Sequence, residues 1–260
     1  MAVRRIVSLV PSTTELLCAL GLADALVGVT VYCVEPRDVV RTKTRIGGEK
    51  DPDLTAIRAL APDLVVANVE ENRREDVEAL RAAGVEVVLT YPRTVAESLS
   101  MIRELGDVTG AGAAARALLA ELEPLYASVK TRLAGHRPTP CFYPIWRDPW
   151  MTIGHDTYIH DLLATCGGAN VFADRARYPT TTLEEVAARA PEVVLLPDEP
   201  FRFRQKHVRE LQAYATMPAV RDGRVQLVDG KRFSWHGPRL AEALRTVPAL
   251  LGHRERPRDR

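Results

Sequence analysis

Two stretches of this chain, DPDLTAIRALAPDLVVAN at Asp51–Asn68 and TTLEEVAARAPEVVLLPD at Thr181–Asp198, are nearly alike. Aligning Asp53 with Thr182 needs no gap and pairs leucine with leucine, alanine with alanine and proline with proline. A solenoid would show three or more copies, and only two are found. The repeat therefore predicts a duplicated unit, with one copy in each of two similar lobes.

Each copy is predicted to be a helix followed by a strand. Asp53 and Thr182 are residue types that cap a helix N-terminus, and apolar residues follow at helical spacing. Pro62 and Pro191 end the helices, because proline disfavours helical geometry in the residue before it. The apolar runs DLVVA and EVVLL are typical of strands that are buried on both faces of a parallel sheet.

The remaining chain alternates strands and helices, which predicts an α/β fold with parallel sheets and helices on both faces. We expect a first α/β lobe at residues 1–93, linking helices at 94–136 and a second α/β lobe at 137–260. One long helix over Ala111–Leu133 should join the lobes, with Pro124 kinking it or fixing a bend. The predicted fold class is thus two parallel-sheet lobes joined by a single long backbone helix.

Two local patterns give more detailed expectations. The segment PSTTELLCALG reads as a helix in which Ser12 and Glu15 have the spacing of a capping box. The second lobe should begin with one strand, CFYPIW, followed by a loop, RDPWMTIGHDT.

Composition excludes several classes of function. The 260 residues include 35 basic and 34 acidic side chains, so the net charge of +1 does not select nucleic acid as a partner. The four cysteines form no C-x-x-C pair, which argues against a zinc or redox motif. No apolar run is long enough to cross a bilayer, and IVSLV is too short for a signal-peptide core. As written, the sequence predicts a cytoplasmic protein, or a periplasmic or extracytoplasmic one if a leader has been trimmed.

The chain resembles the helical-backbone (class III) substrate-binding proteins of ABC importers, most closely their cobalamin-binding branch. The resemblance covers almost the whole chain and is carried by six segments: RIVSLVPSTTELLCALG, Y-C-x-x-P at Tyr32–Pro36, DLTAIRALAPDLVV, WMTIGHDTYIHDLLATCGGANVF, YPTTTLEEVAARAPEVVLL and FSWHGPRLAEAL. It implies a monomeric protein that binds cobalamin or a related corrinoid, haem or a ferric siderophore in a cleft between lobes. It also implies no catalytic cofactor and no direct membrane insertion.

Aromatic and polar residues gather in the loops expected at the carboxyl ends of the strands, where parallel α/β sheets bind ligands. All three tryptophans are expected in loops of the second lobe, and aromatic faces suit a broad, flat macrocycle. The predicted ligand-binding residues are Tyr32, Glu49, Asn68, Trp146, Arg147, Trp150, Tyr178, Phe233, Trp235 and His236. Cobalamin binders of the family carry tryptophans near the positions of Glu49 and Asn68, so a smaller corrinoid or another chelated metal is also admissible.

Family members dock on a permease through carboxylates on the rim of each lobe. The resemblance implies this role for Glu70, Glu71 and Glu75 in the first lobe and for Glu199 in the second, whose surroundings are otherwise basic. This weak docking chemistry also admits a relative that binds its ligand without transporting it.

His236 follows Trp235 and is the histidine best placed to ligate cobalt or iron axially. The sequence has no nucleophile elbow, P-loop, dinucleotide fingerprint or HExxH helix. A rival hypothesis is a two-lobed enzyme, a chelatase or corrinoid-processing protein, with His236 and Glu49 facing across the cleft. A pure interaction module is a third.

Overall fold

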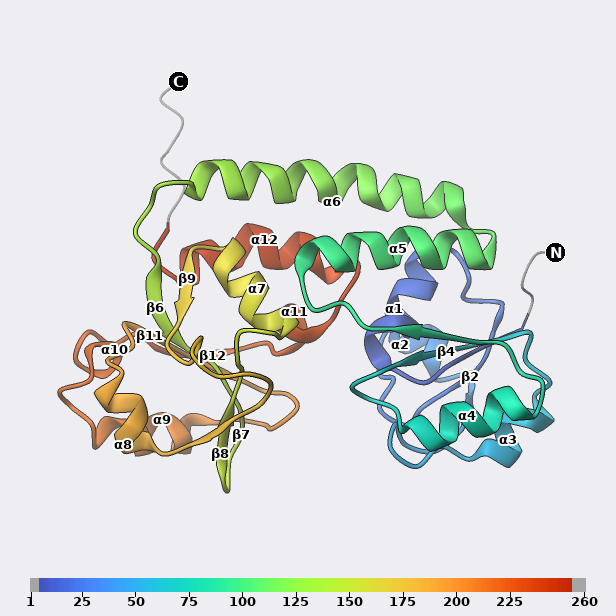
Figure 1. Cartoon of the computed structure of the whole chain (residues 1–260), viewed down its shortest axis with the longest axis horizontal. Coiled ribbons are helices and arrows are strands. Elements are labelled where there is room, and N and C mark those ends of the chain that lie inside the picture. Colours follow the sequence, from blue (N-terminus) through green and yellow to red (C-terminus); the bar gives the residue numbers. More distant parts are fainter. Residues whose placement is uncertain (1–4, 254–260) are drawn as a thin grey trace. The chain divides into compact units, whose positions relative to one another are not determined.

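The computed structural model describes residues 5–253, which divide into two compact units (Figure 1). The first unit holds the described residues up to Pro92 together with Ala96–Glu123 and Trp235–Pro238. The second holds Arg93–Val95, Pro124–Ser234 and the described residues from Arg239 onward. The expected boundaries were residues 93/94 and 136/137, whereas contacts divide the linking region between Glu123 and Pro124.

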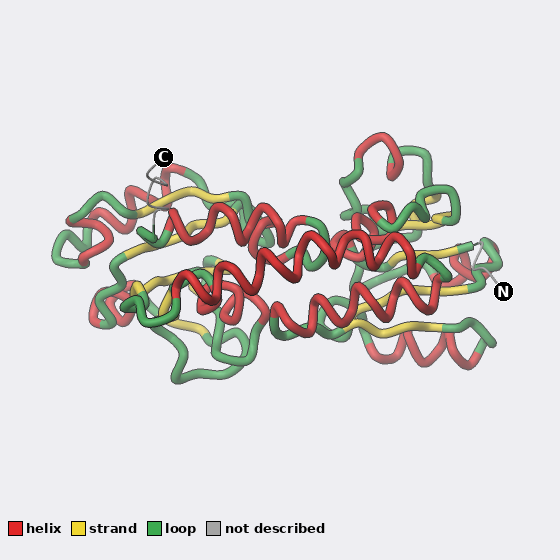
Figure 2. The backbone as a smooth tube through the Cα atoms, turned by 90° about the horizontal axis from the view of Figure 1, so that it is seen from above, coloured by secondary structure: helices red, strands yellow, loops and turns green. Residues whose placement is uncertain are grey.

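The α/β fold class is confirmed, since each unit contains a parallel sheet with helices around it. The expected backbone helix is α6 (Gly112–Leu133), which continues through Pro124 as one helix (Figure 2). Because α6 contains the division between Glu123 and Pro124, it belongs to both units.

The sheet of the first unit has five strands, and every neighbouring pair is parallel. Its spatial order is β3 (Thr44–Arg45), β2 (Leu26–Val29), β1 (Ile6–Ser8), β4 (Leu64–Asn68) and β5 (Val87–Thr90). The connecting helices are α1 (Pro11–Ala19), α2 (Arg37–Val40), α3 (Leu54–Ala59) and α4 (Arg74–Ala82), and α5 (Val95–Thr109) follows the sheet.

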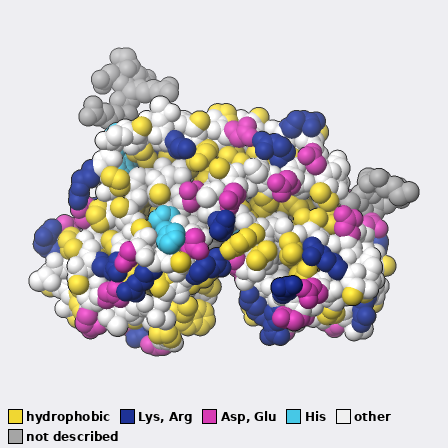
Figure 3. All heavy atoms as spheres, in the orientation of Figure 1, with side chains coloured by type: hydrophobic (Ala, Val, Ile, Leu, Met, Phe, Trp, Pro, Cys, Tyr) yellow, Lys and Arg dark blue, Asp and Glu magenta, His cyan; other side chains and the backbone are white. Residues whose placement is uncertain are grey.

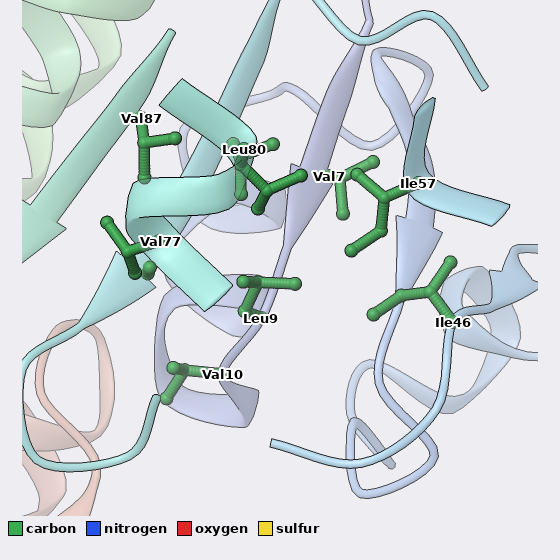
Figure 4. Packing of buried hydrophobic residues seen from close by; sticks show 10 residues of the cluster. Val7, Leu9, Val10, Ile46, Ile57, Val77, Leu80 and Val87 are labelled. Carbon is green, nitrogen blue, oxygen red and sulfur yellow. The ribbon is translucent and has the colours of Figure 1, made fainter. Parts of the chain in front are cut away.

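The core of the first unit is built from the apolar residues of the repeat and its neighbours. Figure 4 shows Val77 and Leu80 of α4 directed toward the sheet, with Ile46 and Ile57 in the same buried cluster. All five residues of β4 are buried, as expected for a central parallel strand.

The second unit has a four-stranded parallel sheet and, in addition, an antiparallel one. The parallel order is β12 (Val225–Val228), β11 (Val193–Pro197), β6 (Thr139–Phe142) and β9 (Gly168–Asn170). The antiparallel order is β10 (Thr180–Thr181), β8 (Trp150–Thr152) and β7 (Pro144–Trp146). The helices are α7 (Tyr158–Thr165), α8 (Leu183–Ala188), α9 (Gln205–Gln212), α10 (Pro218–Arg221), α11 (Lys231–Ser234) and α12 (Arg239–Leu250).

The antiparallel sheet corrects two expectations. The segment CFYPIW is not one strand: β6 ends at Phe142, and β7 begins at Pro144. Part of the expected loop then forms β8, which pairs with β7 on one side and β10 on the other. Trp146 and Trp150 therefore lie on strands of a hairpin rather than in a loop.

The repeat folds as the two copies predict. Asp53 accepts hydrogen bonds from the N–H groups of Thr55 and Ala56 at the start of α3, and Thr182 accepts one from Glu185 at the start of α8. An alanine with a left-handed backbone follows two residues after the end of each helix, Ala61 (φ +42°) after α3 and Ala190 (φ +50°) after α8. The same backbone conformation thus connects each helix to the buried strand that follows it.

The capping box expected at Ser12 and Glu15 is wrong. Pro11 is the first residue of α1 and Val10 is its N-cap, which places Ser12 inside the helix. The hydroxyls of Thr13 and Thr14 instead donate to the Val10 carbonyl, at 3.0 and 2.9 Å. Proline is favoured at a first helical position because that position needs no N–H donor.

The left-handed alanines make a stability prediction. A left-handed backbone costs an L-residue roughly 1–2 kcal/mol, and glycine avoids this cost. Ala61→Gly and Ala190→Gly should each raise the free energy of unfolding by roughly 0.5–1 kcal/mol, after glycine's larger unfolded-state entropy is allowed for. Urea denaturation measures the change. The control Ala117→Gly, at an exposed position inside α6, should lower stability by roughly 0.5–1 kcal/mol. Equal losses in all three variants would contradict this explanation.

Candidate functional site

Exposed apolar side chains gather at the carboxyl edge of the first unit's sheet. Val31, Tyr32 and Val34 follow β2 and are 50, 59 and 46% exposed, and Val69 follows β4 and is 50% exposed. Carboxyl ends of parallel strands meet at one edge, which is where α/β proteins bind ligands. We call residues 30–36, 46–52 and 68–72 the first surface.

Asn72 holds the loops of the first surface together. Its Oδ1 accepts from the Asn68 N–H at 2.8 Å, and its Nδ2 donates to the carbonyls of Glu49 at 3.0 Å and Leu9 at 3.4 Å. Asn72 is buried, so these bonds are shielded from water. Sequence reasoning did not single out Asn72, although its position five residues after the end of a predicted buried strand was a usable signal.

The structure brings Glu49, Asn68 and Tyr32 together on the first surface. Asn68 is 4% exposed; its Nδ2 donates to Thr90 Oγ1 at 3.2 Å and its Oδ1 accepts from the Glu70 N–H at 2.8 Å. The Tyr32 ring lies over Gly48, where an added Cβ would be 3.4 Å from the ring and 2.2 Å from an oxygen of Asp51. Asn68 therefore shapes the loop, while Tyr32 presents the open aromatic face.

The acidic residues of the first unit differ in their surroundings. The Lys50 ammonium donates to the Glu70 carbonyl. Burial raises the pKa of Glu71, and nearby Lys50 opposes this shift. Glu75 is exposed in the first turn of α4. Among these three glutamates, Glu75 is thus the one most open to a partner.

Asn72 gives a test of how the first surface is held. Asn72→Ala would leave the partly buried Glu49 carbonyl, the buried Leu9 carbonyl and the buried Asn68 N–H without their bonds to Asn72, at a cost of about 2–3 kcal/mol in unfolding free energy. Asn72→Asp keeps the acceptor and loses the two donor bonds, so it should still be destabilised. Urea denaturation compares both with Glu78→Ala, an exposed change on α4. An Asn72→Ala variant as stable as Glu78→Ala would show that these bonds do not hold the loops.

The second unit presents an aromatic cluster formed by Trp146, Trp150, Phe201, Phe203 and His207. Phe201 and Phe203 have ring centroids 4.8 Å apart, and each is within 5.4 Å of His207. Trp146 meets Phe201 edge to face at 5.6 Å, and Trp150 stacks on Phe203 at 5.5 Å. Trp146 is 43% exposed, so the cluster offers an open aromatic edge. Sequence reasoning missed Phe201, Phe203 and His207, because it read the segment after β11 only for its charge.

Polar and cation–aromatic contacts hold His207 of the aromatic cluster and two predicted ligand-binding residues, Arg147 and Tyr178. His207 is buried, its Nδ1 accepts from the Arg204 N–H at 2.8 Å, and burial lowers its pKa. Arg147 donates to Glu210 at 2.8 Å and also pairs with Asp148. Tyr178 lies beside the guanidinium of Arg177, 5.3 Å from its ring centroid, in the loop between β9 and β10.

Three aromatic or histidine positions differ from expectation. Phe233 is wholly buried against Tyr143, with centroids 5.1 Å apart. Trp235 is 6% exposed, and it and His236 belong by their contacts to the first unit, where Gly237 approaches Leu16. The expectation that all three tryptophans lie in the second lobe is therefore wrong, and the hypothesis that His236 and Glu49 face each other across the cleft stays a hypothesis. The cause is tertiary: a short segment after α11 packs against a helix near the start of the chain.

Two other sequence-derived positions can be described. The Glu199 carboxylate accepts a hydrogen bond from Ser234 at 3.0 Å, and Gly230 packs against it so closely that a Cβ there would lie 2.6 Å from Glu199 Cγ. Burial of the His236 imidazole lowers its pKa to about 4. His236 is consequently neutral at pH 7, the form that can coordinate a metal. Within residues 5–253, no three His, Cys, Asp or Glu side chains are placed to hold a metal ion by themselves.

The His236 pKa predicts acid sensitivity. In the unfolded chain His236 has its ordinary pKa of 6.5, whereas in the folded chain its pKa is about 4. The unfolded chain therefore binds more protons between these two values, and the free energy of unfolding falls as the pH drops from about 6.5 to about 4. At pH 5 the contribution is about 2 kcal/mol. His236→Gln should reduce the difference in unfolding free energy between pH 7 and pH 5 by this amount. The control is His155→Gln, at an exposed histidine, which should change it little. A His236→Gln protein with the parent's pH dependence would refute the assignment.

Two α/β units, each with a parallel sheet, share the long helix α6, and each presents an exposed aromatic side chain, Tyr32 in the first and Trp146 in the second. These features define a helical-backbone protein for small-molecule binding. The chain belongs to the periplasmic binding protein family, whose profile matches residues 6–231. Among residues 5–253, no helix has both the length and the apolar character of a membrane span.

Curated relatives agree with this family. The chain is 32% identical over 200 residues to the vitamin B12-binding protein of Salmonella paratyphi A, covering 75% of this chain and 73% of the relative. It is 25% identical over 249 residues to the vitamin B12-binding protein of Vibrio cholerae, covering 95% of this chain and 88% of the relative.

Solved structures share the fold. The periplasmic vitamin B12 binding protein BtuF of Vibrio cholerae superposes with a TM-score of 0.85 at 24% identity, covering 96% of this chain and 97% of that one. The periplasmic heme-binding protein RhuT from Roseiflexus sp. RS-1, in apo form, gives a TM-score of 0.83 at 25% identity, covering 96 and 98%.

Proposed function

We propose that this protein binds cobalamin or a closely related corrinoid as a receptor rather than as an enzyme. The observation that carries the proposal is the match to proteins named vitamin B12-binding protein, at up to 32% identity over three quarters of the chain. Membership of a binding-protein family supports the receptor over the chelatase-like alternative.

The two aromatic surfaces give the proposal a physical basis. Tyr32 on the first surface and Trp146 at the edge of the aromatic cluster are 59 and 43% exposed. Open aromatic faces provide large contact area for a flat macrocycle with little loss of side-chain entropy.

Haem is the second candidate ligand. The fold is shared with heme-binding proteins as well as with BtuF, and a neutral His236 has the chemistry of an axial ligand. His236→Ala should alter the visible spectrum of bound haem or corrinoid only if the imidazole coordinates the metal.

Transport and location follow from the family as proposals. Glu75 is the exposed carboxylate best suited to meet a permease from the first unit, and Glu199 is the corresponding candidate on the second unit. The cytoplasmic location expected from the sequence stays a prediction, and fractionation of cells that express the full-length gene tests it.

Titration with cyanocobalamin tests the proposal. The protein should bind it saturably, followed by calorimetry or visible absorption, and Trp146→Ala should weaken binding about 10- to 30-fold, or roughly 1.4–2 kcal/mol. Tyr32→Ala should weaken it by a similar or smaller factor. Trp235→Ala is a poorer probe than the sequence suggested, because a buried tryptophan contributes about 3–5 kcal/mol to stability.

The matched control is Val108→Ala, which removes an exposed apolar side chain of α5. It should leave cyanocobalamin affinity unchanged. Haemin and a ferric siderophore are titrated in parallel. Saturable binding of haemin without binding of cyanocobalamin would transfer the proposal to haem, and no binding of any of the three would overturn it.

A further inference from the structure

The second unit has a surface cavity of about 350 Å³ beside the turn of the β7–β8 hairpin and the start of α8. Its walls are formed by Asp148, Pro149, Trp150, Thr181, Thr182, Leu183, Glu184 and Tyr214. Figure 3 shows hydrophobic side chains gathered at the end of this unit where Figure 1 places the hairpin. The volume is at the lower end of the range for small-molecule sites.

Trp150, a member of the aromatic cluster, also gives this cavity an aromatic wall. One face of its indole is stacked on Phe203, with an interplanar angle of 21°, and Phe203 does not line the cavity. The indole is partly exposed and lines the cavity. Tyr214 adds a second ring to the wall. Aromatic faces carry a negative quadrupole potential, which attracts cations.

Glu184 adds a negative charge, and within residues 5–253 no cationic side chain contributes to the shift of its pKa. Its Oε1 accepts a hydrogen bond from the Tyr214 hydroxyl at 2.6 Å, which favours the ionised carboxylate and lowers the pKa of Glu184. The other contribution to this shift from a side chain comes from Thr182, which is also uncharged. Asp148 also lines the cavity; its side chain is 79% exposed and forms an ion pair with Arg147.

The combination selects one chemical class of ligand. A bare metal ion requires several oxygen, nitrogen or sulfur ligands, and the described residues offer no such group. An alkylammonium group is weakly hydrated and fits an indole face with a carboxylate at one side and apolar contacts from Pro149 and Leu183. An anion would be repelled by the Glu184 carboxylate.

We propose that this cavity is a second binding site, one that takes a small organic ammonium ion, with the indole face of Trp150 and the carboxylate of Glu184 as its principal contacts. The site belongs to the second unit alone and does not depend on the corrinoid proposal. An open cavity with one aromatic face and one carboxylate binds weakly, so a Kd in the millimolar range is expected.

Choline chloride is the probe, titrated into the intact protein while the indole N–H resonances are followed by NMR, with the Trp150 signal assigned from Trp150→Leu. The Trp150 resonance should shift saturably. The neutral isostere 3,3-dimethyl-1-butanol should bind at least fivefold more weakly. Absence of a saturable shift up to about 100 mM choline, roughly a hundredfold above a 1 mM Kd, would overturn the proposal. Equal affinity for the neutral isostere would overturn it too, because the charge would then contribute nothing.

Glu184→Gln tests the site without relying on a tryptophan variant that also affects packing. It should weaken choline binding about three- to tenfold, whereas Asp222→Asn, an exposed carboxylate change beyond the cavity lining, should not. Cyanocobalamin affinity of Glu184→Gln should remain within twofold of the parent. Loss of both ligands in this variant would contradict a separate site, and unchanged choline affinity would remove Glu184 from it.

Discussion

The complete burial of two central strands, β4 and β11, is the constraint on which the rest of each unit depends. Every residue of both strands is buried, and each strand is hydrogen-bonded to a neighbour on both sides. A shift of register would expose apolar residues or bury polar ones, so the register is strongly specified. The helices α3 and α8 precede these strands through the same alanine-proline turn, which fixes where each strand begins.

The functional surfaces follow from where those two strands end. The chain leaves β4 into the turn at Asn68–Asn72, whose amides tie the first surface together. It leaves β11 into the segment that carries Phe201 and Phe203, which organise the aromatic cluster. The same helix-strand order therefore precedes both loops, and the two loops differ in their chemistry. Hydrogen bonds of the Asn68 and Asn72 amides hold the loop after β4, and contacts between aromatic rings hold the segment after β11.

The features that were predicted correctly from the sequence are those that depend on residues close together in the chain. The caps at Asp53 and Thr182, the proline stops and the buried strands are all encoded within a few residues, and they fold as expected. The β7–β8 hairpin was missed because its strands are three residues each and one of them pairs with the distant β10. Trp235 and His236 were assigned to the wrong lobe because Gly237 packs near Leu16, and this contact between residues far apart in the sequence cannot be read from local patterns. Tyr32 and Trp146 are exposed, and their expected role in ligand binding stays a prediction.

Hydrogen-deuterium exchange of the intact protein, with and without saturating cyanocobalamin, tests most directly whether the loops after the two buried strands form the binding surfaces. Amides of β4 and β11 should exchange most slowly in the free protein, because opening them requires unfolding of their unit. Cyanocobalamin should slow exchange in residues 30–36 and 68–72 of the first unit and in residues 144–150 and 198–204 of the second. Protection confined to the opposite edges of the sheets, around α3 and α8, or no protection at a saturating concentration, would contradict the account.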